Sequence, residues 1–597
     1  MSQAPSYDVI VVGAGFAGLC TAIALRNNGI NNFVVLEKAD EVGGTWRENT
    51  YPGAACDVMS LMYSFSFAQR WDWSRGYAAQ PEILDYLRHV ADAYDLRRSI
   101  RFGTEVVSEI FDDDNDLWKV TTAVGEIFTG RIVVSATGPL HIPNVPDIPG
   151  AESFTGTAFH SARWDHSIDL TGKTVAVIGT GASAVQFIPH VAEQAAHLSV
   201  FQRTPSWVLP KLDRSISSAE RAAYRHVPGL RRVVRAGIYF SHEALIGAFL
   251  RPKYMPAVRA LAKTHLRRQV RDPQLRKQLT PDYEVGCKRM VIDNCFYPAL
   301  QRDNVDLITA PITEITPTGL RTGDGSAHPV DVIIYGTGFK VTDKAVDQHL
   351  VGLNGRSVQQ LWRDGVQSYL GVATHGLPNY FTLLGPNSGV GNQSILFMIE
   401  AQTRYVVALL AAMRAREATR VEVKSHVQDQ FNRDLQRKSA DTVWTSGGCS
   451  SWYLDADGTN RAVWPASTLS YWRTTRKAGS NDFEFTRADD RHDDEYHGPA
   501  HVIAEDGREF PVRAHLLALY QPLAGTVCWS GRLDPSPDRE ELHRIINRAV
   551  QLRIPGNDPV PAKLTERDPW GGTHISGQGQ SPYQTGAEWE LANLADA

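Results

Sequence analysis

A glycine-rich loop occurs twice in this chain, each time between an apolar strand and a helix, and it constrains the fold more than any other feature. The first copy, Gly13-Ala14-Gly15-Phe16-Ala17-Gly18, follows an apolar strand at 9–12. The second, Gly179-Thr180-Gly181-Ala182-Ser183-Ala184, follows a strand at 175–178, and alanine is tolerated at the third glycine position. Strand, loop, helix and second strand within about 30 residues form the dinucleotide-binding βαβ unit. The sequence therefore predicts an α/β fold with two Rossmann-like domains, each placing a pyrophosphate at a helix N-terminus.

The residue that ends the second strand differs between the two copies. Glu37 lies 24 residues after Gly13, and Arg203 lies 24 residues after Gly179. A carboxylate at this position accepts hydrogen bonds from both ribose hydroxyls, whereas an arginine pairs with a 2′-phosphate. The first copy is therefore expected to bind FAD or NAD, and the second to bind NADP(H).

Two further apolar strands, at 131–138 and 331–338, both end in a Thr-Gly turn, and each follows its own glycine loop. This repeat indicates that one dinucleotide domain is inserted into the other, the arrangement of a flavoprotein. The predicted divisions are an FAD-binding domain in two parts (1–148 and 341–476), an NADP-binding domain in two parts (149–212 and 285–340), a helical subdomain (213–284), an acidic linker (477–496), a small β-rich domain (497–555) and a loose tail (556–597).

Composition excludes several other classes of protein. The 61 Lys and Arg and 66 Asp and Glu leave a net charge of −5, which gives no reason to expect a nucleic-acid partner. Six cysteines in 597 residues, without a CxxC, favour neither a disulfide scaffold nor a zinc or dithiol centre. No HExxH is complete and no GxSxG occurs, so no metal is expected. Because no basic leader and no run of 18 apolar residues is present, a cytoplasmic protein without a transmembrane segment is expected.

The helical subdomain is rich in arginine at helical spacing. Solvated helix faces are the simplest interpretation, and contact of 236–250 with a membrane surface is the alternative. In the small β-rich domain, Asp506-Gly507 between alternating segments predicts a hairpin.

Two longer strings connect the chain to a known family. The first has the form FxGxxxHxxxW(P/D), with its fixed positions at Phe154, Gly156, His160, Trp164 and Asp165. The second has the form (A/G)GxWxxxx(F/Y)P(G/M)xxxD, carried by Gly43, Gly44, Trp46, Tyr51, Pro52, Gly53 and Asp57. Both resemble the fingerprints of type I Baeyer–Villiger monooxygenases, which are class B flavin-dependent monooxygenases. The resemblance covers about residues 7–475 and leaves an extra small C-terminal domain outside it.

The resemblance implies an NADPH- and O2-dependent FAD monooxygenase that converts ketones to esters or lactones through a C4a-peroxyflavin anion. An anion in a closed site calls for a permanent cation, and arginine keeps its proton. By resemblance this cation is Arg289, held near the flavin by Asp57. Lys288 would join Arg203 and Thr204 at the 2′-phosphate.

The remaining roles follow from the same resemblance. Trp46 and Tyr63 are expected to pack against the isoalloxazine, and Val106 to meet the adenine through its backbone. Trp452 is either a mobile lid or a packed aromatic side chain. His160 and Trp164 would organise domain motion and NADP placement, with a hydrogen-bonded core histidine as the alternative for His160. The expected cofactor contacts are Gly13, Gly15, Phe16, Ala17, Gly18, Glu37, Lys38, Gly44, Thr45, Trp46, Asp57, Tyr63, Val106, Thr137, Gly138, Gly179, Thr180, Gly181, Ala182, Ser183, Ala184, Arg203, Thr204, Lys288, Arg289 and Trp452.

Three other functions stay open at this point. The nearest is a flavin-containing monooxygenase that oxidises amine or sulfide heteroatoms. An NADPH-dependent disulfide reductase is disfavoured by the missing CxxC, and a purely binding role is least favoured. The sequence names neither the ketone nor the oligomeric state.

Overall fold

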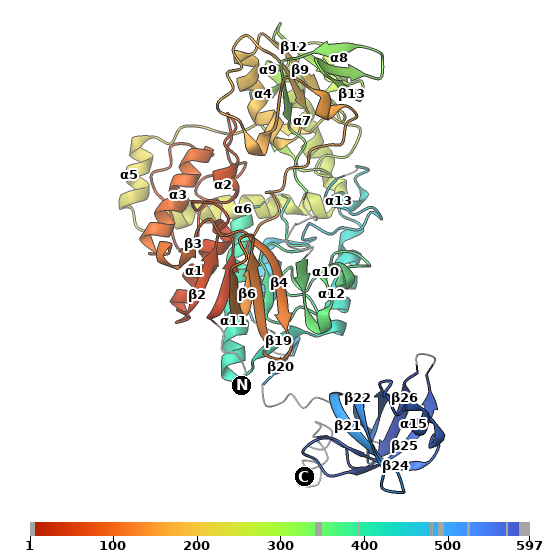
Figure 1. The fold of residues 1–597 in the computed structure, drawn as a ribbon. Coiled ribbons are helices and arrows are strands. Elements are labelled where there is room, and N and C mark those ends of the chain that lie inside the picture. The colour runs from red at the N-terminus through yellow and green to blue at the C-terminus, as the bar shows by residue number, and fades with distance from the viewer. Residues whose placement is uncertain are drawn as a thin grey trace. The chain divides into compact units, whose positions relative to one another are not determined.

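The computed structural model describes residues 6–340, 349–391, 393–449, 451–477, 479, 481–487, 495–521, 526–568 and 571–583. The chain divides into two compact units (Figure 1). Unit 1 comprises 1–416 and 420–485, and unit 2 comprises 417–419 and 486–597. Each unit is described by itself.

The first sheet of unit 1 carries the first glycine loop. Its central strand β1 pairs in parallel with β2 and β6, with Val11 opposite both Val35 and Val134. The residues at 9–12, 33–36 and 132–134 of these strands are apolar and buried, as parallel strands covered by helices require. The order is β17-β4-β5-β6-β1-β2-β3, with β18 also paired to β6. The bounds are β1 (Tyr7–Val12), β2 (Phe33–Leu36), β3 (Ile100–Arg101), β4 (Val106–Asp112), β5 (Leu117–Thr122), β6 (Ile127–Ser135), β17 (Leu350–Val351) and β18 (Tyr380–Thr382).

The second sheet has five strands, all parallel, in the order β12-β9-β8-β16-β7. Strand β16 pairs with β8 just as β6 pairs with β1, so the expected repeat of strand and Thr-Gly turn is confirmed. The bounds are β7 (Thr157–His160), β8 (Thr174–Ile178), β9 (His197–Phe201), β12 (Val305–Ile308) and β16 (Val332–Tyr335). Smaller sheets are formed by β10 (Val208–Leu209) with β11 (Val291–Ile292), by β13 (Ile312–Thr316), β14 (Gly319–Thr322) and β15 (Ala327–Pro329), and by β19 (Arg420–Val423) with β20 (Phe483–Thr486).

The helices of unit 1 are α1 to α14, of which α5 to α8 fall within residues 213–284. The bounds are α1 (Phe16–Asn27), α2 (Thr45–Glu48), α3 (Gln80–Ala93), α4 (Ala182–Gln194), α5 (Ser218–His226), α6 (Leu230–Leu250), α7 (Met255–Gln269), α8 (Pro273–Gln278), α9 (Phe296–Ala299), α10 (Val358–Leu361), α11 (Ile395–Ala415), α12 (Ser425–Ser439), α13 (Val443–Ser446) and α14 (Thr468–Thr474).

Two of these helices, α6 and α11, are long and apolar enough to cross a membrane by length and composition alone. In α11, 56% of the apolar window is buried, and in α6 only 17%. Helix α11 is therefore a core helix of unit 1. Helix α6 exposes Val233 and Phe240, and its contact with a membrane surface stays a hypothesis.

Unit 2 contains a closed barrel of six antiparallel strands in the order β21-β22-β23-β26-β25-β24. Val502, Leu516 and Trp529 are among the buried side chains that fill it. The expected hairpin at Asp506-Gly507 is confirmed by the pairing of β21 with β22. The bounds are β21 (Glu495–Ile503), β22 (Glu509–Gln521), β23 (Thr526–Leu533), α15 (Arg539–Arg544), β24 (Ala549–Arg553), β25 (Val560–Arg567) and β26 (Thr573–Gln578).

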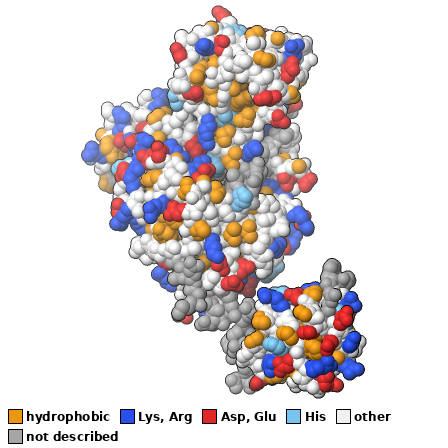
Figure 2. Space-filling model, viewed as in Figure 1, with side chains coloured by type: hydrophobic (Ala, Val, Ile, Leu, Met, Phe, Trp, Pro, Cys, Tyr) orange, Lys and Arg blue, Asp and Glu red, His pale blue; other side chains and the backbone are white. Residues whose placement is uncertain are grey.

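The expected end of this domain at 555, with a loose tail over 556–597, is wrong, because β25 and β26 lie beyond it and close the barrel. Strand β20 lies within the stretch expected to be an acidic linker, and residues 488–494 of that stretch are outside the described part of the chain. Acidic and basic side chains are intermixed over the face of each unit seen in Figure 2.

Candidate functional site

A cavity of about 1480 Å³ in unit 1 receives residues from both glycine loops. It lies where the parallel strands of both sheets end, the usual place for ligands in open α/β sheets. Of the expected site residues, these line it: Gly13, Gly15, Phe16, Ala17, Glu37, Lys38, Gly44, Thr45, Trp46, Asp57, Tyr63, Val106, Thr137, Gly138, Gly179, Thr180, Gly181, Ala182, Ser183, Arg203, Thr204, Lys288, Arg289 and Trp452.

The first glycine loop brings backbone close to the cavity wall. Gly13 has φ +103°, and a Cβ there would lie 2.8 Å from the carbonyl oxygen of Ala136. A Cβ on Gly18 would lie 1.8 Å from the carbonyl oxygen of Gly13, so helix α1 packs against the loop only with glycine there. Gly15 is the N-cap of α1 and faces the cavity. The free N–H groups of this helix end suit a pyrophosphate. Gly18 therefore does not line the cavity but allows helix α1 to pack closely against the loop.

The second loop repeats this geometry. Gly179 has φ +105°, and its Cβ would lie 2.6 Å from the carbonyl oxygen of Gly336. Gly181 caps α4 at the cavity. Ala184 is fully buried behind the loop, and a Cβ on Gly336 would come within 3.0 Å of its methyl group. Gly336, which has no Cβ, leaves room for the Ala184 methyl group, so glycine is not needed at the third position of this loop.

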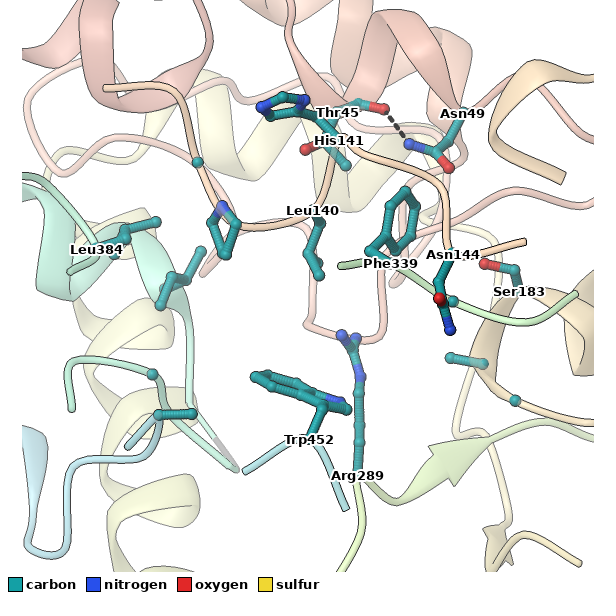
Figure 3. A pocket seen from close by; sticks show the side chains of 18 of the residues that line it. Thr45, Asn49, Leu140, His141, Asn144, Ser183, Arg289, Phe339, Leu384 and Trp452 are labelled. Carbon is teal, nitrogen blue, oxygen red and sulfur yellow. Dashed lines mark hydrogen bonds between the residues drawn. The ribbon is translucent and has the colours of Figure 1, made fainter. Parts of the chain in front are cut away.

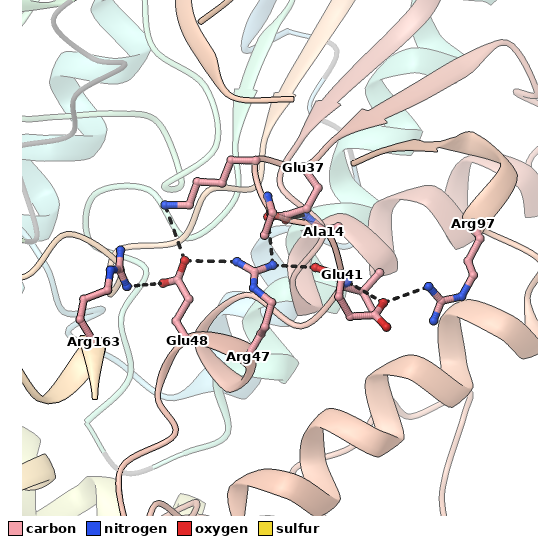
Figure 4. A network of polar contacts seen from close by, with 10 residues as sticks. Ala14, Glu37, Glu41, Arg47, Glu48, Arg97 and Arg163 are labelled. Carbon is pink, nitrogen blue, oxygen red and sulfur yellow. Dashed lines mark hydrogen bonds and ion pairs between the residues drawn. The ribbon is translucent and has the colours of Figure 1, made fainter. Parts of the chain in front are cut away.

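Glu37 is buried at the end of β2 and is already hydrogen-bonded. One carboxylate oxygen accepts the N–H of Ala14 (2.7 Å), and the other accepts the N–H of Ala39 and an N–H of Arg47, both at 3.0 Å. Figure 4 shows the ion pairs continuing from Arg47 to Glu48. Glu48 also pairs with Lys38, at 3.6 Å. The network fixes the Glu37 carboxylate against the first loop. The sequence did not reveal Arg47, because nothing in the glycine pattern marks its position.

Two cations gather at the second loop. Arg203 follows β9 at the cavity wall, and Lys288 lies 5.0 Å from the ring centre of Tyr283. Burial and the neighbouring charge of Arg203 lower the pKa of Lys288. The Thr180 hydroxyl donates to the carbonyl oxygen of Thr204 and joins the loop to this corner. Two like charges held together are costly without an anion between them, so the corner is suited to a phosphate.

Arg289 and Asp57 form an ion pair in the lining of the cavity. The Arg289 Nη2 lies 3.3 Å from Asp57 Oδ2. The arginine side chain is 48% exposed, but that surface opens into the cavity (Figure 3). Burial opposes its charge, yet the Asp57 carboxylate prevails and the pKa of Arg289 is raised. The arginine is therefore held as a cation.

Gln186 and Trp452 complete this centre. The Gln186 amide donates to Asp57 Oδ1 at 3.3 Å, and its carbonyl oxygen accepts the Tyr51 hydroxyl at 2.9 Å. In Figure 3 the Trp452 ring lies alongside the Arg289 side chain. Trp452 is 47% exposed and its ring contacts that of Tyr453, with centres 4.5 Å apart. Gln186 was missed from the sequence, because only the folded chain brings α4 to the 51–57 segment.

An aromatic group borders the first loop. The Trp46 indole N–H donates to the Tyr63 hydroxyl at 3.1 Å, and the two rings meet edge to face. Phe16 contacts Tyr63 with ring centres 5.3 Å apart. Val106 begins β4 and lines the same end of the cavity. This wall offers a flat ring system the apolar surface it needs.

The first fingerprint lies away from the cavity lining. A Cβ on Gly156 would lie 2.4 Å from the carbonyl oxygen of Asp331. His160 is buried on β7, where its Nδ1 accepts the N–H of Ala162 and burial lowers its pKa. Trp164 packs against Phe187, with ring centres 5.3 Å apart. Phe154 packs against a buried apolar cluster. The Asp165 carboxylate accepts the N–H of Ser167 and stabilises the turn there. The first fingerprint therefore shapes the segment that contains β7, the edge strand of the second sheet.

Comparison with known proteins agrees with this geometry. A model of the pyridine nucleotide-disulphide oxidoreductase family matches residues 10–223, and one for a domain of unknown function (DUF4873) matches residues 493–585. The crystal structure of OTEMO complexed with FAD and NADP is similar at a TM-score of 0.74 and 29% identity, covering 81% of this chain and 100% of that one.

Two curated relatives named Baeyer–Villiger monooxygenase are closer in sequence. The protein of Streptomyces coelicolor is 43% identical over 481 residues, which cover 80% of this chain and 92% of the relative. That of Pseudomonas aeruginosa is 43% identical over 480 residues, covering 80% and 91%. The identity extends along almost the whole length of both relatives. The two glycine loops and the arginine–carboxylate pair around one cavity agree with it. The chain belongs to the Baeyer–Villiger monooxygenases.

Proposed function

We propose that this chain is an FAD-dependent monooxygenase that uses NADPH and O2 to convert ketones to esters or lactones. The observation that carries the proposal is the Asp57–Arg289 pair in a cavity reached by both glycine loops. A disulfide reductase needs a dithiol that faces the flavin. Cys287 and Cys449, the disulfide-bonded pair, are outside the lining of the cavity, whereas Arg289 lines it. The family relationship supports the same reaction and does not favour heteroatom oxidation as the main activity.

The residues of the first loop fit FAD. Gly13 and Gly18 leave no room for a Cβ, and the α1 N-terminus at Gly15 directs N–H groups into the cavity. Glu37 would accept a ribose hydroxyl with the one lone pair of Oε2 that its three hydrogen bonds leave free. Trp46 and Tyr63 would flank the ring system. Bound FAD, reduced by NADPH, would supply the electrons that activate O2.

The residues of the second loop fit NADPH. Arg203 and Lys288 would pair with the 2′-phosphate, with Thr204 beside them, and the lowered pKa of Lys288 would return toward normal when the phosphate binds. The N–H groups at Gly181, where α4 begins, would hold the pyrophosphate.

Arg289 would hold negative charge where oxygen meets the ketone carbonyl. A preorganised donor to such a charge contributes about 2.7–4 kcal/mol to the transition state. Asp57 orients the guanidinium, and Gln186 orients Asp57. Trp452 would cover this end of the cavity and keep water from the reacting atoms.

The two sheets support the proposed division of the chain, with 1–148 and 341–476 as the FAD half and 149–212 and 285–340 as the NADP half. Residues 213–284 would be the helical insert. We further propose a cytoplasmic enzyme whose small-molecule partners are the ketone, NADPH and O2.

The test is a product analysis of the purified yellow protein with NADPH, a ketone and a sulfide in parallel. Ester from the ketone, in amounts that match the NADPH consumed, is expected. Sulfoxide with no ester from a broad ketone panel would instead establish heteroatom oxidation. A protein that carries no flavin would contradict the proposal altogether.

A further inference from the structure

A disulfide joins the two segments that carry Arg289 and Trp452. Cys287 and Cys449 are bonded, 162 residues apart in sequence, with their Cα atoms 6.1 Å apart. Cys287 immediately precedes Lys288 and Arg289, and Cys449 lies three residues before Trp452. The bond therefore limits how far the Trp452 loop can move from the arginine.

The two ends of the bond differ in their surroundings. Cys287 is fully buried in an apolar cluster that includes Phe249 and Trp444, and a Cβ on Gly447 would lie 2.6 Å from its Cβ. Cys449 is partly buried and follows Gly448, which has φ +74° and an open surrounding. Cys287 is thus the end of the bond that packing holds in place, and Cys449 is the end with open space beside it.

Thiols inside cells are kept reduced, so a disulfide in an intracellular enzyme is more often a redox sensor than a permanent brace. Hydrogen peroxide is the oxidant that fits, since an NADPH- and O2-consuming flavoenzyme releases it whenever reduction is not followed by oxygen transfer. The Cys449 thiolate would attack one peroxide oxygen, which breaks the O–O bond and gives a sulfenic acid and water. The Cys287 thiol would then displace the second water and form the S–S bond. Two thiols lose two electrons, and one H2O2 becomes two H2O.

We propose that Cys287 and Cys449 are a reversible peroxide-sensitive switch on the Trp452 loop. The disulfide holds Trp452 beside Arg289, so NADPH electrons go into product, and the dithiol form lets the loop open and peroxide escape. Peroxide leaked by the open form would therefore close the site that leaked it. The inference rests on the roles proposed for Arg289 and Trp452, whereas the chemistry of the pair can be tested without them.

The first experiment counts thiols in the full-length, flavin-loaded protein after alkylation under denaturing conditions. The peroxide-treated protein should show the four cysteines that are free in the structure, and all six after a dithiol reductant. Cys449→Ser should show five in both states. Cys295→Ser, which removes an exposed free cysteine, should still show a gain of two on reduction. Six free thiols after peroxide treatment would overturn the proposal.

The second experiment measures hydrogen exchange in peptides covering 447–453. Reduction should speed exchange about tenfold in the wild type and in Cys295→Ser, and Cys449→Ser should exchange fast in either state. This measurement needs no turnover, so it stays informative if the enzyme acts on no ketone tested. Equal exchange in both redox states would show a brace rather than a switch.

The third experiment compares peroxide released per NADPH consumed. The reduced wild type should release about threefold more than the oxidised enzyme, the change expected if the open population rises by that factor. Cys449→Ser should match the reduced form whatever its treatment. Equal peroxide release by the oxidised and the reduced enzyme would overturn the switch even if the disulfide forms. Absence of ester from every ketone would instead count against the proposed function.

Discussion

The Gln186 amide on α4 donates a hydrogen bond to Asp57 Oδ1 over 3.3 Å. Gln186 lies on α4, two residues after the loop expected to hold NADPH, and Asp57 is the last fixed position of the second fingerprint. The other oxygen of Asp57 faces Arg289. One neutral side chain therefore connects the second dinucleotide loop with the residue that orients the arginine.

Gln186→Leu should lower the ester formed per NADPH about tenfold, since a hydrogen bond to a charged carboxylate contributes about 1.5–3 kcal/mol and Gln186 acts on the arginine only through Asp57. Flavin content should stay as in the wild type, because no part of the first loop changes. Gln430→Leu, on the exposed face of α12, is the matched control and should behave as the wild type. An unchanged ratio in Gln186→Leu would mean that Asp57 holds the arginine without help from α4.

Arg289→Ala should abolish most oxygen transfer, with a loss of about a hundredfold to a thousandfold in ester formation. NADPH oxidation should continue, and hydrogen peroxide should account for the electrons. Arg289→Lys should be intermediate, because it keeps the charge and loses the planar fork. Arg321→Ala, which removes only a surface ion pair with Glu314, serves as the control. Wild-type coupling in Arg289→Ala would place the essential cation elsewhere.

Arg203→Ala should weaken NADPH binding about tenfold to a hundredfold, because a charged hydrogen bond contributes about 1.5–3 kcal/mol. NADH, which has no 2′-phosphate, should bind as before. Titration of the flavin-loaded protein with each coenzyme gives the two dissociation constants. Arg302→Ala, an exposed arginine near the same sheet, should change neither. A matching loss for NADH would show that Arg203 contacts another part of the coenzyme.

A chain that ends at Arg487 should bind FAD and oxygenate ketones as the full chain does, because the barrel closes on its own core. A chain that ends at Arg476 lacks β20, the buried Phe483 and the Asp482 carboxylate that accepts the Tyr369 hydroxyl. Loss of a buried phenylalanine costs about 1.5–3 kcal/mol, so this shorter chain should melt at a lower temperature. Loss of oxygenation by a well-folded, flavin-loaded chain ending at Arg487 would give the barrel a part in catalysis.

The sequence predicted what local patterns encode. Both glycine loops, the acid and arginine that follow them, and the strands ending in Thr-Gly turns depend on residues near one another in the chain, and the structure contains them all. The partners of Glu37 and Asp57 were not predictable, because Arg47 and Gln186 reach them only through tertiary packing. The Cys287–Cys449 bond likewise has no signal in the spacing of its cysteines.

The predicted end of the small β-rich domain at residue 555 was wrong for a different reason. Proline, glycine and glutamine around 556–597 suggested a chain without strands. Yet residues 560–564 alternate between buried and exposed side chains in β25, the period of a half-buried strand. The prolines at 559 and 561 obscured that alternation, although a strand can accept proline where its N–H is not needed.

In the C-terminal barrel, every strand pairs with a neighbour on both sides. A sheet with open edges invites strands from other molecules, whereas a sealed one does not. Such a module can be attached to the end of an enzyme, or transferred to another, without drawing its host into fibres. The hydrogen-bond topology of the barrel alone would therefore allow its attachment to different enzymes.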